Sequence, residues 1–187
     1  LGLYGSKYFS DHPTVSLTEV NYMINMDMVG RMNDSTKTVT IGGVGTSPTW
    51  GTLLYADKKP AFGIKIDSSG TGPSDHTSFY RKDIPVVCFF TGLHTDYHKP
   101  SDDANRINYE GEYRIVQLVY DLIKKTPADN KLIFTKTREQ QTGTSTRFSV
   151  SLGIMPDYSF SGAGVRVDGV SDGKPAKKAG IQAGDVI

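Results

Sequence analysis

The sequence predicts an α/β fold, with an open and mostly parallel sheet covered by helices on both faces, followed by a smaller β-rich domain. Apolar runs of strand length alternate with stretches of helical periodicity, which is typical of βαβ units. From about Thr135 the residues are mainly Thr, Gln, Gly and Ser, and short alternating segments follow. These changes predict an α/β domain at 1–134, a linker at 135–147 and a partial β-rich domain at 148–187.

The predicted strands of the first domain are apolar runs that end in polar or glycine-rich sequence. They lie at 20–26, 62–66 and 84–90, and a further strand precedes the glycine-rich segment 42–45. Because these runs are apolar almost throughout, they indicate strands that are buried on both faces.

The predicted helices begin at residues that are suited to capping. One helix ends before His12. Ser47 and the first-turn proline after it start a helix over 48–59, and Ser74 caps a short helix through Tyr80. Asn108 caps the longest helix, 109–125. This helix carries a stripe at helical spacing that we expect to line the core: Tyr109, Tyr113, Val116, Tyr120 and Ile123.

The second domain is predicted from shorter signals. Segments 148–154 and 164–170, and the residues from 185 onward, alternate like short strands. Residues 175–179 predict a brief helix that Gly180 closes.

Bulk properties exclude several classes of protein. The 21 basic and 20 acidic side chains of the 187 residues are interspersed and give a net charge of +1, so we expect no nucleic-acid partner. No run approaches the roughly 18 apolar residues of a membrane span, and Leu1 does not open a signal sequence. Cys88 is the only cysteine. It excludes an internal disulfide and a thiolate zinc site, so a bound metal would need oxygen and nitrogen ligands.

Polar segments follow three of the predicted strands, and we expect them to meet at one edge of the sheet. The first is Asp27, within Asn25-Met26-Asp27-Met28-Val29-Gly30. A carboxylate at the end of an apolar strand needs a cation, a metal or several N–H donors as partner. The alternative is a turn or capping aspartate before Gly30.

The second segment places Asp75 beside His76 at a helix start, where the carboxylate can orient an imidazole or a substrate amine. The alternative is a simple helix cap by Ser74. The third segment, 94–103, contains His94. Its ring can bind zinc through one nitrogen while the other donates to Asp102 or Asp103, and the alternative is a solvated loop histidine.

Four motifs in one order resemble a known family. They are Gly-Leu-Tyr-Gly-Ser at 2–6, Asn-Met-Asp-Met-Val-Gly at 25–30, Ser-Asp-His-Thr-Ser-Phe at 74–79 and Asp-Tyr-His-Lys-Pro-Ser-Asp-Asp at 96–103. Over roughly the first 130 residues the chain resembles the co-catalytic dizinc aminopeptidases, a zinc exopeptidase clan that includes glutamate carboxypeptidase and glutaminyl cyclase. The resemblance implies an α/β/α sheet of the zinc exopeptidase type.

The resemblance also implies roles for individual residues. Asp27 corresponds to the carboxylate ligand of one Zn²⁺ and His98 to the imidazole ligand of the other. Asp75 corresponds to an acidic position that supports the site or orients substrate, and His76 and Tyr97 line it. The general base and the remaining ligands are expected upstream of Leu1, so the residues printed here are expected to be inactive alone.

The implied reaction is hydrolysis of N-terminal peptide bonds by two zinc ions about 3.5–4 Å apart, with a glutamate that takes the proton of a bridging water. One alternative is an acyltransferase of the glutaminyl cyclase type, which uses one zinc. Another is a non-catalytic scaffold that binds peptides. Relatives with this domain pair are exported bacterial proteins, which implies a periplasmic or secreted location.

The end of the chain resembles part of a PDZ domain. Ser151-Leu152-Gly153-Ile154 matches the loop that binds a peptide carboxylate, and 164–170 and 179–187 match later parts of such a domain. PDZ domains capture the C-terminus of a peptide by strand addition, so the resemblance implies a C-terminal peptide as a second ligand.

Overall fold

The computed structural model describes residues 3–55, 62–127, 130–137, 152–156 and 162–187. The chain divides into two compact units, Leu3–Gln140 and Gln141–Ile187, which we describe separately. Thr135 and Thr137, within the predicted linker, are hydrogen-bonded in the first unit. The Thr135 amide donates to the Thr46 carbonyl at 2.8 Å, and the Thr137 amide donates to the Tyr80 hydroxyl at 3.0 Å. The predicted domain limits remain a prediction.

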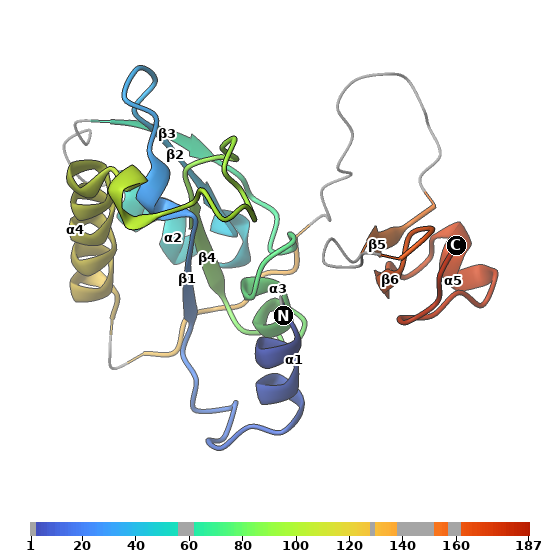
Figure 1. The fold of residues 1–187 in the computed structure, drawn as a ribbon. Helices are drawn as coiled ribbons and strands as arrows, with labels where there is room; N and C mark the ends of the chain where they lie inside the picture. The colour runs from blue at the N-terminus through green and yellow to red at the C-terminus, as the bar shows by residue number, and fades with distance from the viewer. Residues whose placement is uncertain (1–2, 56–61, 128–129, 138–151, 157–161) are drawn as a thin grey trace. The chain divides into compact units, whose positions relative to one another are not determined.

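The first unit is built on a four-stranded sheet in the order β1-β4-β2-β3 (Figure 1). The strands are β1 (Met23–Asp27), β2 (Thr38–Gly42), β3 (Gly63–Ile66) and β4 (Val86–Phe90). β1 pairs with β4 in parallel and β2 pairs with β3 in parallel, whereas β2 and β4 are antiparallel. The sheet is therefore mixed. Its two parallel pairs are joined by the antiparallel pairing of β4 with β2.

The α/β class and the parallel pairs agree with the sequence prediction, but the antiparallel contact between β2 and β4 was not predicted. A parallel return needs a crossover of about a dozen residues or more. The connection 28–37 between β1 and β2 holds only a short 3₁₀ turn, η1 (Val29–Arg31). It therefore favours a reversal of direction, which apolar periodicity alone does not reveal.

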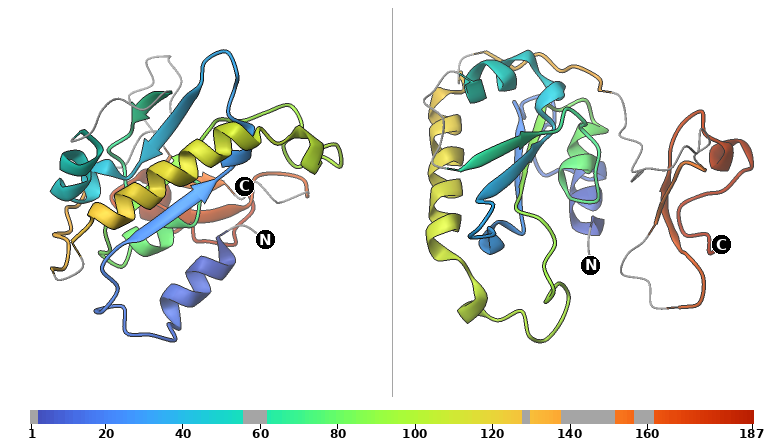
Figure 2. Two further views of the ribbon diagram at one scale, coloured as in Figure 1. Left: turned by 90° about the vertical axis from the view of Figure 1, so that its left-hand side faces the viewer. Right: turned by 90° about the horizontal axis from the view of Figure 1, so that it is seen from above.

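Helices cover both faces of this sheet (Figure 2). α2 (Pro48–Tyr55) and α4 (Tyr109–Lys125) lie on one face, and α1 (Tyr4–Asp11) and α3 (His76–Tyr80) lie on the other. Two further 3₁₀ turns are η2 (Val44–Thr46) and η3 (Ala104–Arg106). The main core fills the α2 and α4 side, and its largest buried members are Trp50, Phe89, Ile41 and Ile115. The predicted residues 56–59 of the second helix lie outside the described residues.

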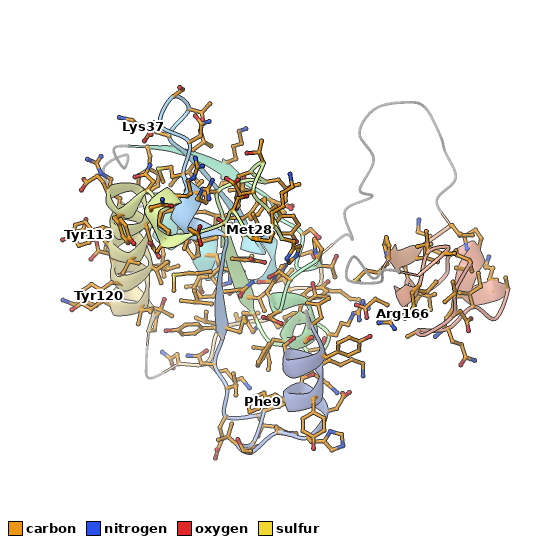
Figure 3. The ribbon with its side chains drawn as sticks, in the orientation of Figure 1. Phe9, Met28, Lys37, Tyr113, Tyr120 and Arg166 are labelled. Carbon is orange, nitrogen blue, oxygen red and sulfur yellow. The ribbon has the colours of Figure 1, made fainter. Side chains whose placement is uncertain are left out.

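Helix α4 begins as predicted but turns a different face to the core. The Asn108 side chain accepts a hydrogen bond from the Gly111 amide at 2.9 Å, which caps the helix. The buried residues are Gly111, Ile115, Val119 and Leu122. The aromatic stripe that was expected to line the core is 45–62% exposed, and Tyr113 and Tyr120 project away from the sheet (Figure 3). Both rows have helical spacing, so periodicity could not decide which one faces the sheet.

The orientation of α4 gives a stability prediction. Ile115→Ala should lower the free energy of unfolding by about 2–5 kcal/mol, because the side chain is fully buried and its removal leaves a cavity. The neighbouring Val116→Ala should change it by no more than about 0.5 kcal/mol, because Val116 is 45% exposed. Urea unfolding of the two variants compares the faces directly. Similar losses for both variants would contradict this orientation.

The second unit contains a small antiparallel sheet. β5 (Ile154–Pro156) pairs with β6 (Val167–Val170), and the short helix α5 (Pro175–Lys178) follows. An isolated antiparallel bridge joins Arg166 to Val186. β6 and α5 thus lie within predicted segments, whereas β5 overlaps the predicted segment 148–154 only at Ile154, and the segment from 185 onward contributes an isolated bridge. Residues 148–151 lie outside the described part of the chain.

Candidate functional site

The candidate site lies at the edge where β1 and β4 end. Their parallel register pairs Asp27 with Phe90, so both strands leave the sheet side by side. Met28, the first residue beyond β1, is labelled at this edge in Figure 3. The segment 91–103 follows β4 directly. Asp27 and the loop that carries His98 therefore belong to the same edge of the sheet, as the parallel pairing predicts.

Asp27 is partly buried and is held by a hydroxyl group. Its Oδ2 accepts a hydrogen bond from Ser74 Oγ at 2.6 Å, and Asn25 Nδ2 donates to the same hydroxyl at 2.7 Å. Among the residues that the structure describes, no cationic side chain forms an ion pair with Asp27. This carboxylate is therefore oriented without being neutralised, which is an arrangement suited to a metal ligand.

Ser74 reaches Asp27 in place of capping a helix. The sequence predicted Ser74 as the N-cap of the following helix, but α3 begins at His76, its N-cap position is Asp75, and no side chain caps it. β3 ends at the opposite end of the sheet from β1, since β2 and β4 are antiparallel. The chain then returns along 67–75 to Asp27. Asp75 itself is exposed at the start of α3.

His76 is buried beside these carboxylates. It is 5% exposed, and its Nδ1 has no hydrogen-bond partner among the described residues. A Cβ on Gly72 would lie 3.2 Å from its Nε2. Burial lowers the pKa of His76 to about 4, while the negative charges of Asp27 and Asp75 act in the opposite direction. The ring is therefore neutral at physiological pH.

This pKa predicts a pH dependence of stability. Between about pH 6.5 and 4 the unfolded chain binds a proton at His76 that the folded chain does not, so the stability falls as the pH falls through this window. The loss due to His76 is about 3 kcal/mol. Urea unfolding at pH 7 and pH 4 should show a smaller loss in His76→Gln than in the unsubstituted protein. If the free energy of unfolding had the same pH dependence in the two proteins, the lowered pKa of His76 would be wrong.

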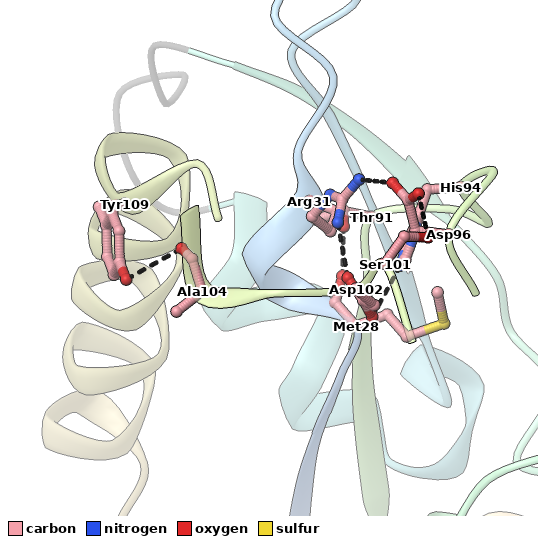
Figure 4. A network of polar contacts seen from close by, with 9 residues as sticks. All are labelled: Met28, Arg31, Thr91, His94, Asp96, Ser101, Asp102, Ala104 and Tyr109. Carbon is pink, nitrogen blue, oxygen red and sulfur yellow. Dashed lines mark hydrogen bonds and ion pairs between the residues drawn. The ribbon is translucent and has the colours of Figure 1, made fainter. Parts of the chain in front are cut away.

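Ion pairs and a hydrogen bond connect the loop 91–103 to the segment that follows β1 (Figure 4). Arg31 Nη2 lies 2.7 Å from Asp96 Oδ2 and its Nη1 lies 2.6 Å from Asp102 Oδ1. The Thr91 hydroxyl also donates to the Met28 carbonyl. The Arg31 guanidinium, and then the Ser101 hydroxyl, hold the pKa of Asp96 below its usual value.

The two histidines of this loop differ in their surroundings. The side chain of His94 is only 13% exposed and its Nε2 lies 3.7 Å from Asp102 Oδ2, so the alternative of a solvated loop histidine is wrong. His98 is exposed, in a turn with a φ of 55°, and its ring centroid lies 3.9 Å from that of Tyr97. The imidazole of His98 is thus accessible to a ligand.

The residues present fit zinc in kind. A carboxylate and an imidazole are ligands that zinc commonly takes, and Asp27 is oriented without a counter-ion. Burial raises the pKa of the Cys88 thiol to about 11, so the metal-free thiol is protonated at neutral pH. Within the described ranges no group of three or more His, Cys, Asp or Glu side chains is arranged so that it could hold a metal ion. The donor atoms of Asp27 and His98 are therefore compatible in kind with zinc.

Two contacts of this site were missed from the sequence. Arg31 was not singled out, although a cation four residues after Asp27 and three acidic residues in 96–103 are a signal of possible pairing. The bond from Ser74 to Asp27 has no such signal, because serine before a helix predicts a cap equally well.

The predicted loop that binds a peptide carboxylate, 151–154, belongs to the second unit. Of this loop, Ser151 lies outside the described residues. Leu152 is half-exposed, Gly153 has a φ of 77° and Ile154 begins β5.

Comparison with known proteins gives a family match. The model of peptidase family M28 matches residues 1–123. Leupeptin-inactivating enzyme 1 from Streptomyces exfoliatus is 29% identical over 119 residues, which make up 57% of this chain and 23% of that protein. The chain thus spans about a quarter of the length of this relative.

Solved aminopeptidase structures share the fold. A zinc aminopeptidase from Bacillus subtilis has a TM-score of 0.54 and 24% identity, covering 71% of this chain and 36% of that chain. An aminopeptidase from Aneurinibacillus sp. strain AM-1 has a TM-score of 0.52 and 19% identity, covering 74% of this chain and 32% of that chain. The likeness shows an aminopeptidase-type fold, of which the chain spans about a third.

Proposed function

Because the chain belongs to peptidase family M28, we propose that it is part of a zinc-dependent aminopeptidase that hydrolyses N-terminal peptide bonds. Asp27 binds one of two zinc ions and His98 binds the other. Asp75 supports the site or orients substrate, and His76 and Tyr97 line it. The proposal places the general base and the remaining ligands upstream of Leu1.

The observation that carries this proposal is the state of Asp27. It ends β1, accepts a hydrogen bond from Ser74, and has no ion-pair partner in the described part of the chain. It leaves the sheet beside the strand that leads to His98. A structural aspartate would be expected to cap a helix or pair with a cation. Neither is found here among the described residues, and this supports Asp27 as a metal ligand in the proposal.

The residues of this chain would act by orientation. Ser74 fixes one oxygen of Asp27, which leaves the other carboxylate oxygen for an ion. His76 is buried and neutral, so it adds no positive charge beside the proposed metal site. Zinc, when bound, polarises the scissile carbonyl and makes a hydroxide nucleophile available near neutral pH. The exposed face of Asp75 is free to meet the positive amino terminus of a peptide.

The proposal is tested with the full-length protein. Metal analysis should find two zinc equivalents per chain, and removal of zinc with a chelator should abolish release of N-terminal residues from peptides until zinc is restored. One equivalent with cyclisation of N-terminal glutamine would support the acyltransferase alternative. Peptide binding at 148–187 without zinc or hydrolysis would support the scaffold alternative, in which Ser151, Leu152, Gly153 and Ile154 hold a peptide carboxylate.

A further inference from the structure

One guanidinium group joins the two sides of the loop that carries His98. The side chain of Arg31 is 17% exposed and contacts Asp96 at 2.7 Å and Asp102 at 2.6 Å through separate nitrogens. Asp96 is itself 16% exposed, and its second oxygen accepts a hydrogen bond from the Ser101 hydroxyl at 2.8 Å. Figure 4 shows these contacts as one connected network.

The residues of this network flank both proposed zinc ligands along the chain. Asp96 and Asp102 lie on either side of His98, and Arg31 lies four residues beyond Asp27. The network therefore connects the loop of one proposed ligand to the segment of the other. Thr91 adds a further contact between the two segments, since its hydroxyl donates a hydrogen bond to the Met28 carbonyl.

These ion pairs and hydrogen bonds can stabilise the loop conformation, because the loop has no regular secondary structure. Residues 91–103 form turns and bends and contain no helix or strand. Holding each residue of an irregular loop in one conformation costs conformational entropy. Isolated exposed ion pairs contribute little, but an arginine that bridges two carboxylates in a partly buried network is more effective.

Building on the proposed function, we infer that Arg31 is a positioning residue, whose two ion pairs hold the His98 loop beside Asp27 in the arrangement that binds zinc. It touches neither the ion nor the substrate. Its effect is to reduce the conformational freedom that His98 would otherwise lose on binding the metal.

Electrostatic repulsion alone predicts the opposite change in zinc affinity when Arg31 is replaced, and this makes the inference testable. Removing a positive charge near a cation site, and leaving two carboxylates unpaired, should strengthen zinc binding if charge alone mattered. Arg31→Lys keeps the charge but cannot present two nitrogens in a planar fork. Positioning therefore predicts weaker zinc binding in both Arg31→Ala and Arg31→Lys, whereas charge alone predicts tighter binding in the first and no change in the second.

The test uses full-length protein, with zinc affinity measured by chelator competition and amide exchange of 94–103 measured in the zinc-free state. Both Arg31 variants should bind zinc about 10- to 100-fold more weakly at one site, a loss typical of residues that support metal ligands. Their loop amides should exchange faster than those of the unsubstituted protein. The matched control is Arg114→Ala, which removes an exposed ion pair to Glu110 on α4 and should change neither quantity.

Unchanged or tighter zinc binding in Arg31→Ala, or unchanged loop exchange in both variants, would overturn the inference. If Arg31→Ala fails to fold, Arg31→Lys decides the question alone. Absence of zinc from the unsubstituted protein would refute the proposed function, and the inference would fall with it. Normal zinc content with insensitive Arg31 variants would refute the positioning role alone.

Discussion

Replacing Asp27 by asparagine is expected to remove one of the two zinc ions and to lower kcat/KM for peptide hydrolysis by about 10³-fold. The amide keeps the shape of the side chain, and Ser74 can still donate to its oxygen. It lacks the negative charge that a zinc ligand supplies. A bound metal contributes several kcal/mol to transition-state stabilisation, and each 1.36 kcal/mol corresponds to about tenfold in rate.

The measurement is steady-state cleavage of a peptide substrate together with zinc content by mass spectrometry. Asp121→Asn on the exposed side of α4 serves as the control and should leave both unchanged. An Asp27→Asn protein that retains two zinc ions and full activity would show that Asp27 is a structural turn residue, which was the alternative that the sequence left open.

The strand-end position of Asp27 was predictable because it depends on local pattern. An apolar run that ends in Asp, Met, Val and Gly predicts a strand with one carboxylate at its tip. β1 ends at Asp27, and its parallel pairing with β4 brings in the loop that follows Phe90. Three strands and the cap of α4 were predicted for the same reason.

Contacts between distant segments were not predictable in this way. The Arg31 network joins residues more than sixty positions apart, and the bond from Ser74 to Asp27 depends on the return of 67–75 along the sheet. Neither leaves a periodic signal in the sequence. The exposed stripe of α4 shows the same limit, because Tyr113 and Tyr120 repeat as regularly as the buried Ile115 and Val119.

Substituting His98 by alanine is expected to remove the other zinc ion and to lower kcat/KM by a similar factor of about 10³. His98 is exposed and makes no hydrogen bond among the described residues, so its loss should leave the melting temperature unchanged. A loss of activity without a loss of stability separates a ligand from a structural residue. His12→Ala, at an exposed histidine stacked on Tyr8, is the matched control.

The double variant Asp27→Asn with His98→Ala gives the decisive comparison, because the two residues are proposed to bind different ions. Zinc content should fall from two equivalents to one in each single variant and to none in the double variant. The losses in kcat/KM should not multiply, since ions that act as a unit lose most of their effect when either one is removed. If both single variants lost the same ion, the remaining zinc would stay in the double variant, and the assignment of Asp27 and His98 to separate ions would be wrong.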